Sequence, residues 1–116
     1  SLAKNYLEQM LTSQSSVIYI AMDAVGNAIG FTQLYPSYCS VAAEPILILY
    51  DLYVKKEARN SGVAKALMNQ ALQLAKETGA SRIDLETAID NTSAQSLYES
   101  LGYERDIEFH KYSLEL

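Results

Sequence analysis

Hydrophobic and polar positions recur with two different periods along this chain, and the periods indicate its secondary structure. Near the start, apolar side chains at helical spacing predict an amphipathic helix from Leu2 to about Ser13: Ala3, Tyr6, Leu7, Met10 and Leu11. Two β-forming stretches follow, Val17–Met22 and Ile29–Tyr35. The residues between them, Asp23–Asn27, end in Gly-Asn, which is typical of a hairpin turn.

The middle of the chain contains the longest apolar run and the clearest helix. The run from Ile46 to Val54 is broken by a single polar residue, Asp51, and predicts a buried central strand. Helical periodicity then begins at Gly62 and ends near Thr78, where Gly79 suits a left-handed C-terminal cap. The apolar positions of this helix are Ala64, Leu67, Met68, Ala71, Leu72 and Ala75. The segment around Cys39, between Pro36 and Pro45, has no clear pattern.

The last third of the chain also shows the periods of strands and of a helix. Arg82–Thr87 reads as a short strand, and a second helix runs from an N-cap at Asn91 or Thr92 to Gly102. Alternating apolar residues predict a final strand from Tyr103 to Leu116. A strand, a helix and another strand in this order form a βαβ crossover, which requires parallel pairing and favours ligands at the strand's carboxyl end.

Composition and charge restrict the function classes. With 116 residues, 49% of them hydrophobic, the chain fits a single globular domain. Nine basic and 14 acidic residues give a net charge of −5, which argues against nucleic-acid binding and favours a cationic small molecule. The longest uninterrupted apolar run, Val17–Met22, is too short to cross a membrane. The lone Cys39 and the lack of a signal peptide predict a cytoplasmic protein, although Ser1 at the start allows a processed or partial chain.

The turn between the predicted central strand and helix is a candidate anion site. Backbone N–H groups at a helix N-terminus bind phosphate, and Gly62 allows close approach. Lys55, Lys56 and Arg59 add positive charge. A Walker loop and a dinucleotide fingerprint are both excluded, because no Gly-Lys-Ser/Thr is present and the turn has a single glycine. The alternative is that Gly62 only makes the turn and the lysines are solvated.

Two motifs resemble the GCN5-related N-acetyltransferase (GNAT) family. Arg59-Asn60-Ser61-Gly62-Val63-Ala64 matches that family's (Gln/Arg)-x-x-Gly-x-(Gly/Ala) loop. Asn91-x-x-Ala94-x-x-Leu97-Tyr98-x-x-x-Gly102-Tyr103 is similar to its second motif. The resemblance covers about Ala3 to Leu116. It implies an α/β (α+β) fold with a mixed, mostly antiparallel central sheet and a βαβ crossover.

The resemblance also implies roles in binding acetyl-CoA as co-substrate. Arg59 opens the loop whose backbone amides hold the pyrophosphate: Asn60, Ser61, Gly62, Val63 and Ala64. Leu52 and Val54 offer backbone groups to the pantetheine arm where the central strands part, and Asn91 lines the cofactor's other side. Tyr98 is the general acid that protonates the thiolate. The alternative for Tyr98 is a core aromatic residue at helical spacing.

The catalytic base has two candidates. An alkyl amine has a pKa of about 10.4, so it must lose a proton before it attacks a thioester. Glu86, twelve residues before Tyr98, is placed as in the N-terminal acetyltransferases of ribosomal proteins. Asp51 lies in a stretch that resembles polyamine and thialysine acetyltransferases, except that Tyr50 replaces their Glu. The alternatives are a solvent-facing strand residue for Glu86 and a buried carboxylate at a β-bulge for Asp51.

The sequence therefore predicts an acetyl-CoA-dependent N-acetyltransferase acting on a primary amine of a small molecule, such as a polyamine, or of a peptide N-terminus or lysine. The alternative is a non-catalytic acyl-CoA-binding or dimerising module. Family members usually begin with a strand and a helix that this chain does not show, and a partner subunit can complete such a site. A homodimer is expected, without metal, nucleic acid or membrane, and His110 is expected to be structural.

Overall fold

The computed structural model describes residues 7–12, 16–39, 43–106 and 112–116. The chain forms two compact units, residues 1–86 and residues 87–116. The first unit contains the sheet and the predicted phosphate loop, and the second contains the helix of the second motif. The prediction of a single domain stays a prediction.

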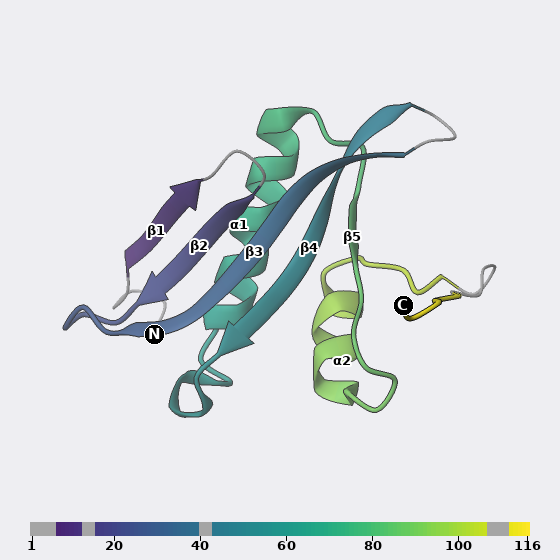
Figure 1. Ribbon diagram of the computed structural model, residues 1–116. Helices are drawn as coiled ribbons and strands as arrows, with labels where there is room; N and C mark the ends of the chain where they lie inside the picture. The colour runs from purple at the N-terminus through teal and green to yellow at the C-terminus, as the bar shows by residue number, and fades with distance from the viewer. Residues whose placement is uncertain (1–6, 13–15, 40–42, 107–111) are drawn as a thin grey trace. The chain divides into compact units, whose positions relative to one another are not determined.

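A five-stranded sheet forms the first unit, in the order β1-β2-β3-β4-β5 (Figure 1). Its strands are β1 (Leu7–Thr12), β2 (Val17–Met22), β3 (Ala28–Cys39), β4 (Glu44–Val54) and β5 (Ile83–Leu85). The first three pairings are antiparallel, and β4 pairs with β5 in parallel. Helix α1 (Val63–Thr78) joins these last two strands. The predicted fold class, a mixed and mostly antiparallel sheet with a βαβ crossover, is confirmed.

The helix predicted at Leu2–Ser13 is wrong over residues 7–12, which form strand β1. This strand pairs with β2 in an antiparallel register from Leu7↔Met22 to Thr12↔Val17. Apolar residues at this spacing suit a helix, but β preference depends on the neighbouring strand and overrides a weak local signal. The rest of the predicted helix lies outside the described residues.

Strand β3 continues into the proline-bracketed segment that the sequence left open. Its predicted end was Tyr35, and the structure extends it to Cys39, opposite Glu44 of β4. Pairing with β2 stops at Leu34↔Val17, so Pro36 lies where β3 has a described neighbour on one side only. A proline lacks a backbone N–H, and it is tolerated at such an edge.

The predicted turn between β2 and β3 is confirmed, and Asp23 closes it. The Asp23 carboxylate accepts hydrogen bonds from the backbone N–H groups of Asn27 at 2.9 Å and Val25 at 3.0 Å. The bond from Asn27 is the main cause that lowers the pKa of Asp23. Gly26 follows with a positive φ of 98°, which glycine adopts without strain.

Helix α1 covers one face of the sheet (Figure 1). Its buried side chains are Val63, Leu67, Met68, Ala71, Leu74 and Ala75. A side chain at Gly30 of β3 would meet the Tyr53 carbonyl oxygen at 2.8 Å and Leu67 at 3.4 Å. The helix approaches closely here, and Gly79 ends it in the predicted left-handed conformation, with φ 73°.

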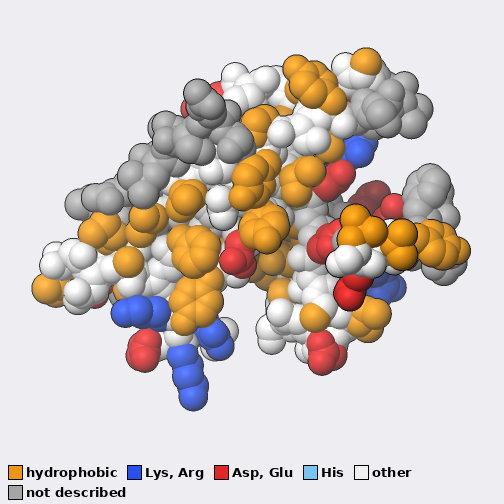
Figure 2. All heavy atoms as spheres, in the orientation of Figure 1, with side chains coloured by type: hydrophobic (Ala, Val, Ile, Leu, Met, Phe, Trp, Pro, Cys, Tyr) orange, Lys and Arg blue, Asp and Glu red, His pale blue; other side chains and the backbone are white. Residues whose placement is uncertain are grey.

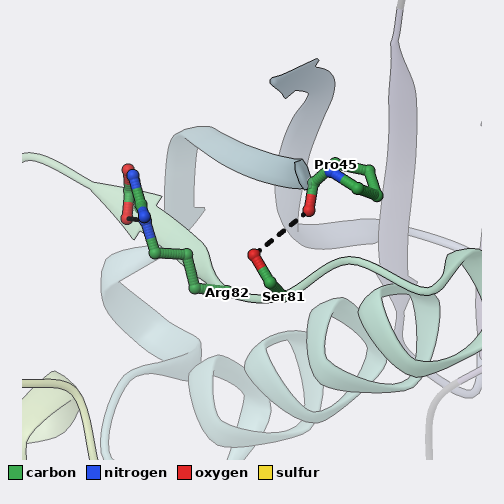
Figure 3. A network of polar contacts seen from close by, with 4 residues as sticks. Pro45, Ser81 and Arg82 are labelled. Carbon is green, nitrogen blue, oxygen red and sulfur yellow. Dashed lines mark hydrogen bonds and ion pairs between the residues drawn. The ribbon is translucent and has the colours of Figure 1, made fainter. Parts of the chain in front are cut away.

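Hydrogen bonds at the start of β4 hold the short strand β5 in place. The backbone N–H of Ser81 donates to the Pro45 carbonyl at 2.8 Å, and the Ser81 hydroxyl donates to the same oxygen at 3.3 Å (Figure 3). The Leu47 N–H donates to the Arg82 carbonyl at 3.1 Å. The strand is shorter than the predicted Arg82–Thr87 and ends at Leu85.

The second unit is built around helix α2 (Thr92–Ser100). Asn91 is its N-cap, because the Asn91 side chain accepts a hydrogen bond from the Ala94 N–H at 3.1 Å. The strand predicted from Tyr103 to Leu116 is wrong where the chain is described, since residues 103–106 and 112–116 pair with no strand. His110 lies outside the described residues.

Candidate active site

The loop between β4 and α1 has the geometry of an anion site. A 3₁₀ turn at Lys56–Ala58 follows the strand, and Ala58 is buried. Asn60 and Gly62 then take positive φ angles of 62° and 88°. Asparagine tolerates this conformation better than most residues, and glycine adopts it freely. The chain thereby turns sharply into the first turn of α1.

Two side chains of the loop bond to the loop itself. The Arg59 Nε group donates to the Val54 carbonyl oxygen at 3.0 Å, which ties the loop to the end of β4. The Ser61 hydroxyl donates to the Ala58 carbonyl oxygen. Arg59 therefore has a structural role in closing the loop, in addition to the charge that it brings.

The backbone N–H groups of this loop are available to a ligand. The first N–H that is bonded within the helix belongs to Ala66, which donates to the Gly62 carbonyl at 3.0 Å. Among the described residues, nothing accepts a hydrogen bond from the N–H groups of Asn60, Ser61, Gly62, Val63 or Ala64. Apart from the residues next to Gly62 in the chain, no atom of the described residues lies within 4 Å of the position that a Gly62 side chain would take. Unpaired N–H groups, the helix dipole and open space together fit a pyrophosphate.

Among the described residues, strand β4 has no strand partner on its β5 side just before this loop. Its pairing with β5 ends at Leu49↔Leu85, although β4 continues to Val54. The Lys55 N–H donates to Ile29 of β3 at 2.8 Å, and backbone groups alternate in direction along a strand. The backbone groups of Leu52 and Val54 therefore face away from β3, toward the edge that β5 leaves. This is the position predicted for residues that bind an extended arm.

A β-bulge on β4 places the first carboxylate. Gln33 pairs with Asp51 and Leu34 with Leu49, which leaves Tyr50 as the extra residue. The bulge was one of the readings of Asp51, but the accompanying expectation of a buried carboxylate is wrong because Asp51 is exposed. The carboxylate can therefore reach a ligand in solvent.

The second carboxylate follows strand β5. Glu86 is one residue beyond Leu85, the last residue paired with β4, and it is exposed. Asp51 is two residues beyond Leu49, the partner of Leu85. Both candidate bases thus lie just past the point where the parallel strands part.

Thr32 of β3 is a buried polar residue that the sequence analysis missed. It is fully buried, and its hydroxyl donates to the Asp51 carbonyl oxygen at 2.8 Å. A buried hydroxyl needs such a partner. The bond fastens β4 beside the bulge. A signal was present, because Thr32 is the polar member of the buried series Gly30, Thr32, Leu34.

We expect Thr32→Val to lower the free energy of unfolding by about 1–3 kcal/mol, because the Asp51 carbonyl loses a buried donor and the side-chain volume stays similar. Urea unfolding followed by circular dichroism measures the change. Amide hydrogen exchange should increase at Asp51 and Leu52 more than in α1. Equal exchange throughout the sheet would contradict a local role for this bond.

The second unit carries the two remaining predicted residues. The Asn91 Oδ1 atom is used by the helix cap, which leaves its Nδ2 group as the donor for a ligand. Tyr98 of α2 is 9% exposed, and its ring lies 6.0 Å from the ring of Tyr103. Burial, and then the proximity of Tyr98, raise the pKa of Tyr103. Tyr98 is therefore packed like the core aromatic residue of the alternative interpretation. It also carries a hydroxyl group, and its ring lies near that of a second tyrosine.

The described ranges contain neither a candidate metal site nor a candidate membrane-spanning helix. No three His, Cys, Asp or Glu side chains there lie close enough together to hold a metal ion. No helix in the same ranges has the length and apolar character needed to cross a membrane.

Comparison with known proteins identifies the family. A family model described as the acetyltransferase (GNAT) family matches residues 2–103. The uncharacterized N-acetyltransferase YhfO of Bacillus subtilis is 43% identical over 112 residues, covering 97% of this chain and 74% of that protein. Human N-acetyltransferase 8 is 31% identical over 104 residues, covering 90% of this chain and 44% of the human protein. The chain thus spans less than half the length of that human relative.

A solved structure extends the comparison to the fold. AAC(6')-Iy in complex with the bisubstrate analog CoA-S-monomethyl-acetylneamine matches with a TM-score of 0.76 and 26% identity, over 90% of this chain and 72% of that one. The chain belongs to the acetyltransferase (GNAT) family, and its fold and family are those of an acetyl-CoA-dependent acetyltransferase.

Proposed function

We propose that the protein transfers the acetyl group of acetyl-CoA to a primary amine of a small molecule or a peptide. The observation that carries this proposal is that no described residue accepts a hydrogen bond from the N–H groups of Asn60 to Ala64, which lie next to the open edge of β4. An anion site that directly follows an extended strand edge suits a ligand with a pyrophosphate and a long polar arm.

These residues fit acetyl-CoA in distinct parts. The loop amides from Asn60 to Ala64 hold the pyrophosphate, and the backbone groups of Leu52 and Val54 bind the pantetheine arm. The Val54 carbonyl already accepts from Arg59, so Leu52 and the Val54 N–H are the groups left for that arm. Bound acetyl-CoA supplies a thioester, whose carbonyl carbon bonds to the amine nitrogen as the carbon–sulfur bond breaks.

The chain's own residues manage the protons of this transfer. A carboxylate, either Asp51 or Glu86, takes a proton from the ammonium so that nitrogen has a free electron pair. Tyr98 gives its hydroxyl proton to the departing sulfur, and the second proton that the nitrogen loses as the amide forms restores the Tyr98 hydroxyl through solvent. Asn91 borders the co-substrate. Both carboxylates also attract a cationic acceptor, in keeping with the net charge of −5.

The acceptor is an amine on a small molecule or a peptide. The support for a small molecule is the structural neighbour in complex with a bisubstrate analog, CoA-S-monomethyl-acetylneamine. A homodimer and cytoplasmic localisation stay predictions.

The test is thiol release. Purified protein is mixed with acetyl-CoA, a panel of alkyl amines, polyamines, amino acids and peptides, and a thiol reagent. We expect at least one amine to release CoA and to yield an acetylated product by mass spectrometry. If CoA raises the melting temperature while no amine is consumed, the protein is a binding module instead and the proposal is wrong.

A further inference from the structure

The sheet face opposite α1 is organised in rows of side chains set by the strand register. A side chain at Gly30 would face Leu67 of α1, so the side chain of its neighbour Phe31 points to the opposite face. The register places Ile20, Phe31 and Tyr53 in one row across β2, β3 and β4. The rings of Phe31 and Tyr53 lie 6.1 Å apart. Figure 2 shows hydrophobic side chains gathered over these strands.

A cavity of about 380 Å³ lies over this row. Its walls include Ile18, Ile20, Ile29, Phe31, Tyr53 and Lys55. Tyr53 is 46% exposed and therefore offers part of its ring to whatever fills the space. The cavity has the size and the lining of a site for an apolar group of a small molecule.

The next row of the same face carries the acidic group. The register aligns Ile18, Gln33 and Asp51 there. The Gln33 Nε2 group donates to the Tyr35 hydroxyl at 3.1 Å and to the Ser16 hydroxyl at 3.4 Å. These bonds orient the amide and leave its Oε1 atom as an acceptor on the row of Asp51. A carboxylate and an amide oxygen are suitable partners for an ammonium group.

The apolar part of the Lys55 side chain lines the other end of the cavity, and Lys55 carries a positive charge at its tip. Asp51 and Tyr53 alternate along β4, and Lys55 continues the alternation one residue beyond its end, so about 13 Å of chain separates Asp51 from Lys55. A chain that extended from an ammonium at Asp51 along β4 would pass Phe31 and Tyr53 before it reached Lys55. The Lys55 charge would repel a second ammonium at the far end of such a substituent, whereas it would attract a carboxylate and leave a methyl group unaffected.

We propose that this face is the acceptor subsite and that it selects a primary amine on an apolar chain without a second positive charge. The inference rests on the proposed function and names its substrate class. Asp51 and Gln33 hold the amine, Phe31 and Tyr53 bind the chain, and Lys55 rejects diamines. The amine stays next to the position where β4 and β5 part, which is where the proposed transfer takes place.

Three amines with the same six-carbon chain test this selectivity: hexylamine, 6-aminohexanoate and 1,6-diaminohexane. We expect kcat/KM, measured by thiol release, to be at least about tenfold higher for the first two than for the diamine. Lys55→Glu should reverse the order of the diamine and 6-aminohexanoate. The ratio of the kcat/KM values of two acceptors, measured with the same variant, cancels any effect of the substitution on acetyl-CoA binding.

Tyr53→Ser tests the apolar row, with methylamine as the matched short acceptor. We expect kcat/KM to fall about tenfold for hexylamine and less than twofold for methylamine, which does not reach the ring. Saturation-transfer NMR of hexylamine with CoA present gives a binding readout that does not depend on turnover, and the signal should weaken in the variant. Equal use of the three six-carbon amines by the unaltered protein would overturn the inference while leaving the proposed function intact. Failure of every amine would overturn both.

Discussion

Gly62→Glu should reduce the affinity for CoA at least about 100-fold, or about 2.8 kcal/mol. Gly62 precedes α1 with φ 88°, among N–H groups that no described residue pairs with. A glutamate there extends a negative charge into the open space next to it, and repels the pyrophosphate. Isothermal titration with CoA measures the loss directly.

Gly79→Glu is the matched control for this substitution. Gly79 ends the same helix with a positive φ of 73°, and it too has open space around it. Both variants carry the backbone strain of a side chain at positive φ, about 1–2 kcal/mol. An acidic residue is unfavourable at a helix C-terminus, so Gly79→Glu should melt at the lower temperature and still bind CoA. Loss of CoA binding in both variants would mean that strain, and not the loop charge, explains the result.

Local signals in the sequence predicted much of the fold. Helix α1 was identified because its apolar period and Gly79 lie within one segment, and the β2–β3 hairpin was identified because Gly26-Asn27 makes the turn. Strand β1 was mistaken for a helix because its state depends on pairing with β2, which the spacing of Leu7 and Leu11 does not encode. The tail from Tyr103 alternates like a strand, yet its described residues have no partner strand.

Some residues of the candidate site can likewise be identified from a local motif, whereas others depend on how the strands pair. The loop from Arg59 to Ala64 is contiguous, so a motif could identify it. The exposed position of Asp51 and the role of Thr32 depend on a one-residue shift between β3 and β4, which appears only when the strands are paired. The rows that join Phe31 to Tyr53 and Gln33 to Asp51 are set by the same register. Sequence motifs therefore predicted a loop for the co-substrate, which stays a prediction, and the strand register was needed to infer the acceptor subsite.

Tyr98→Phe should lower kcat about 100-fold and leave the dissociation constant of CoA within about twofold. The substitution removes a single hydroxyl from a ring that is 9% exposed, so packing is largely retained. A general acid contributes about 10²–10⁴ to a rate, and a thiolate that must leave without a proton donor is a poorer leaving group. Stopped-flow thiol release gives kcat, and titration with CoA gives the dissociation constant.

Tyr103→Phe separates this role from the effects of losing a partly buried tyrosine hydroxyl. The two rings lie 6.0 Å apart, and the Tyr103 backbone N–H donates to the Tyr98 carbonyl at 3.0 Å, a bond that neither substitution removes. Burial raises the pKa of Tyr103, which makes its hydroxyl a weaker acid than a free tyrosine. We therefore expect kcat of Tyr103→Phe to stay within about threefold of the unaltered protein. If the two variants lose activity equally, or if Tyr98→Phe weakens CoA binding as much as it slows turnover, Tyr98 is a packing residue and the sulfur takes its proton from another donor.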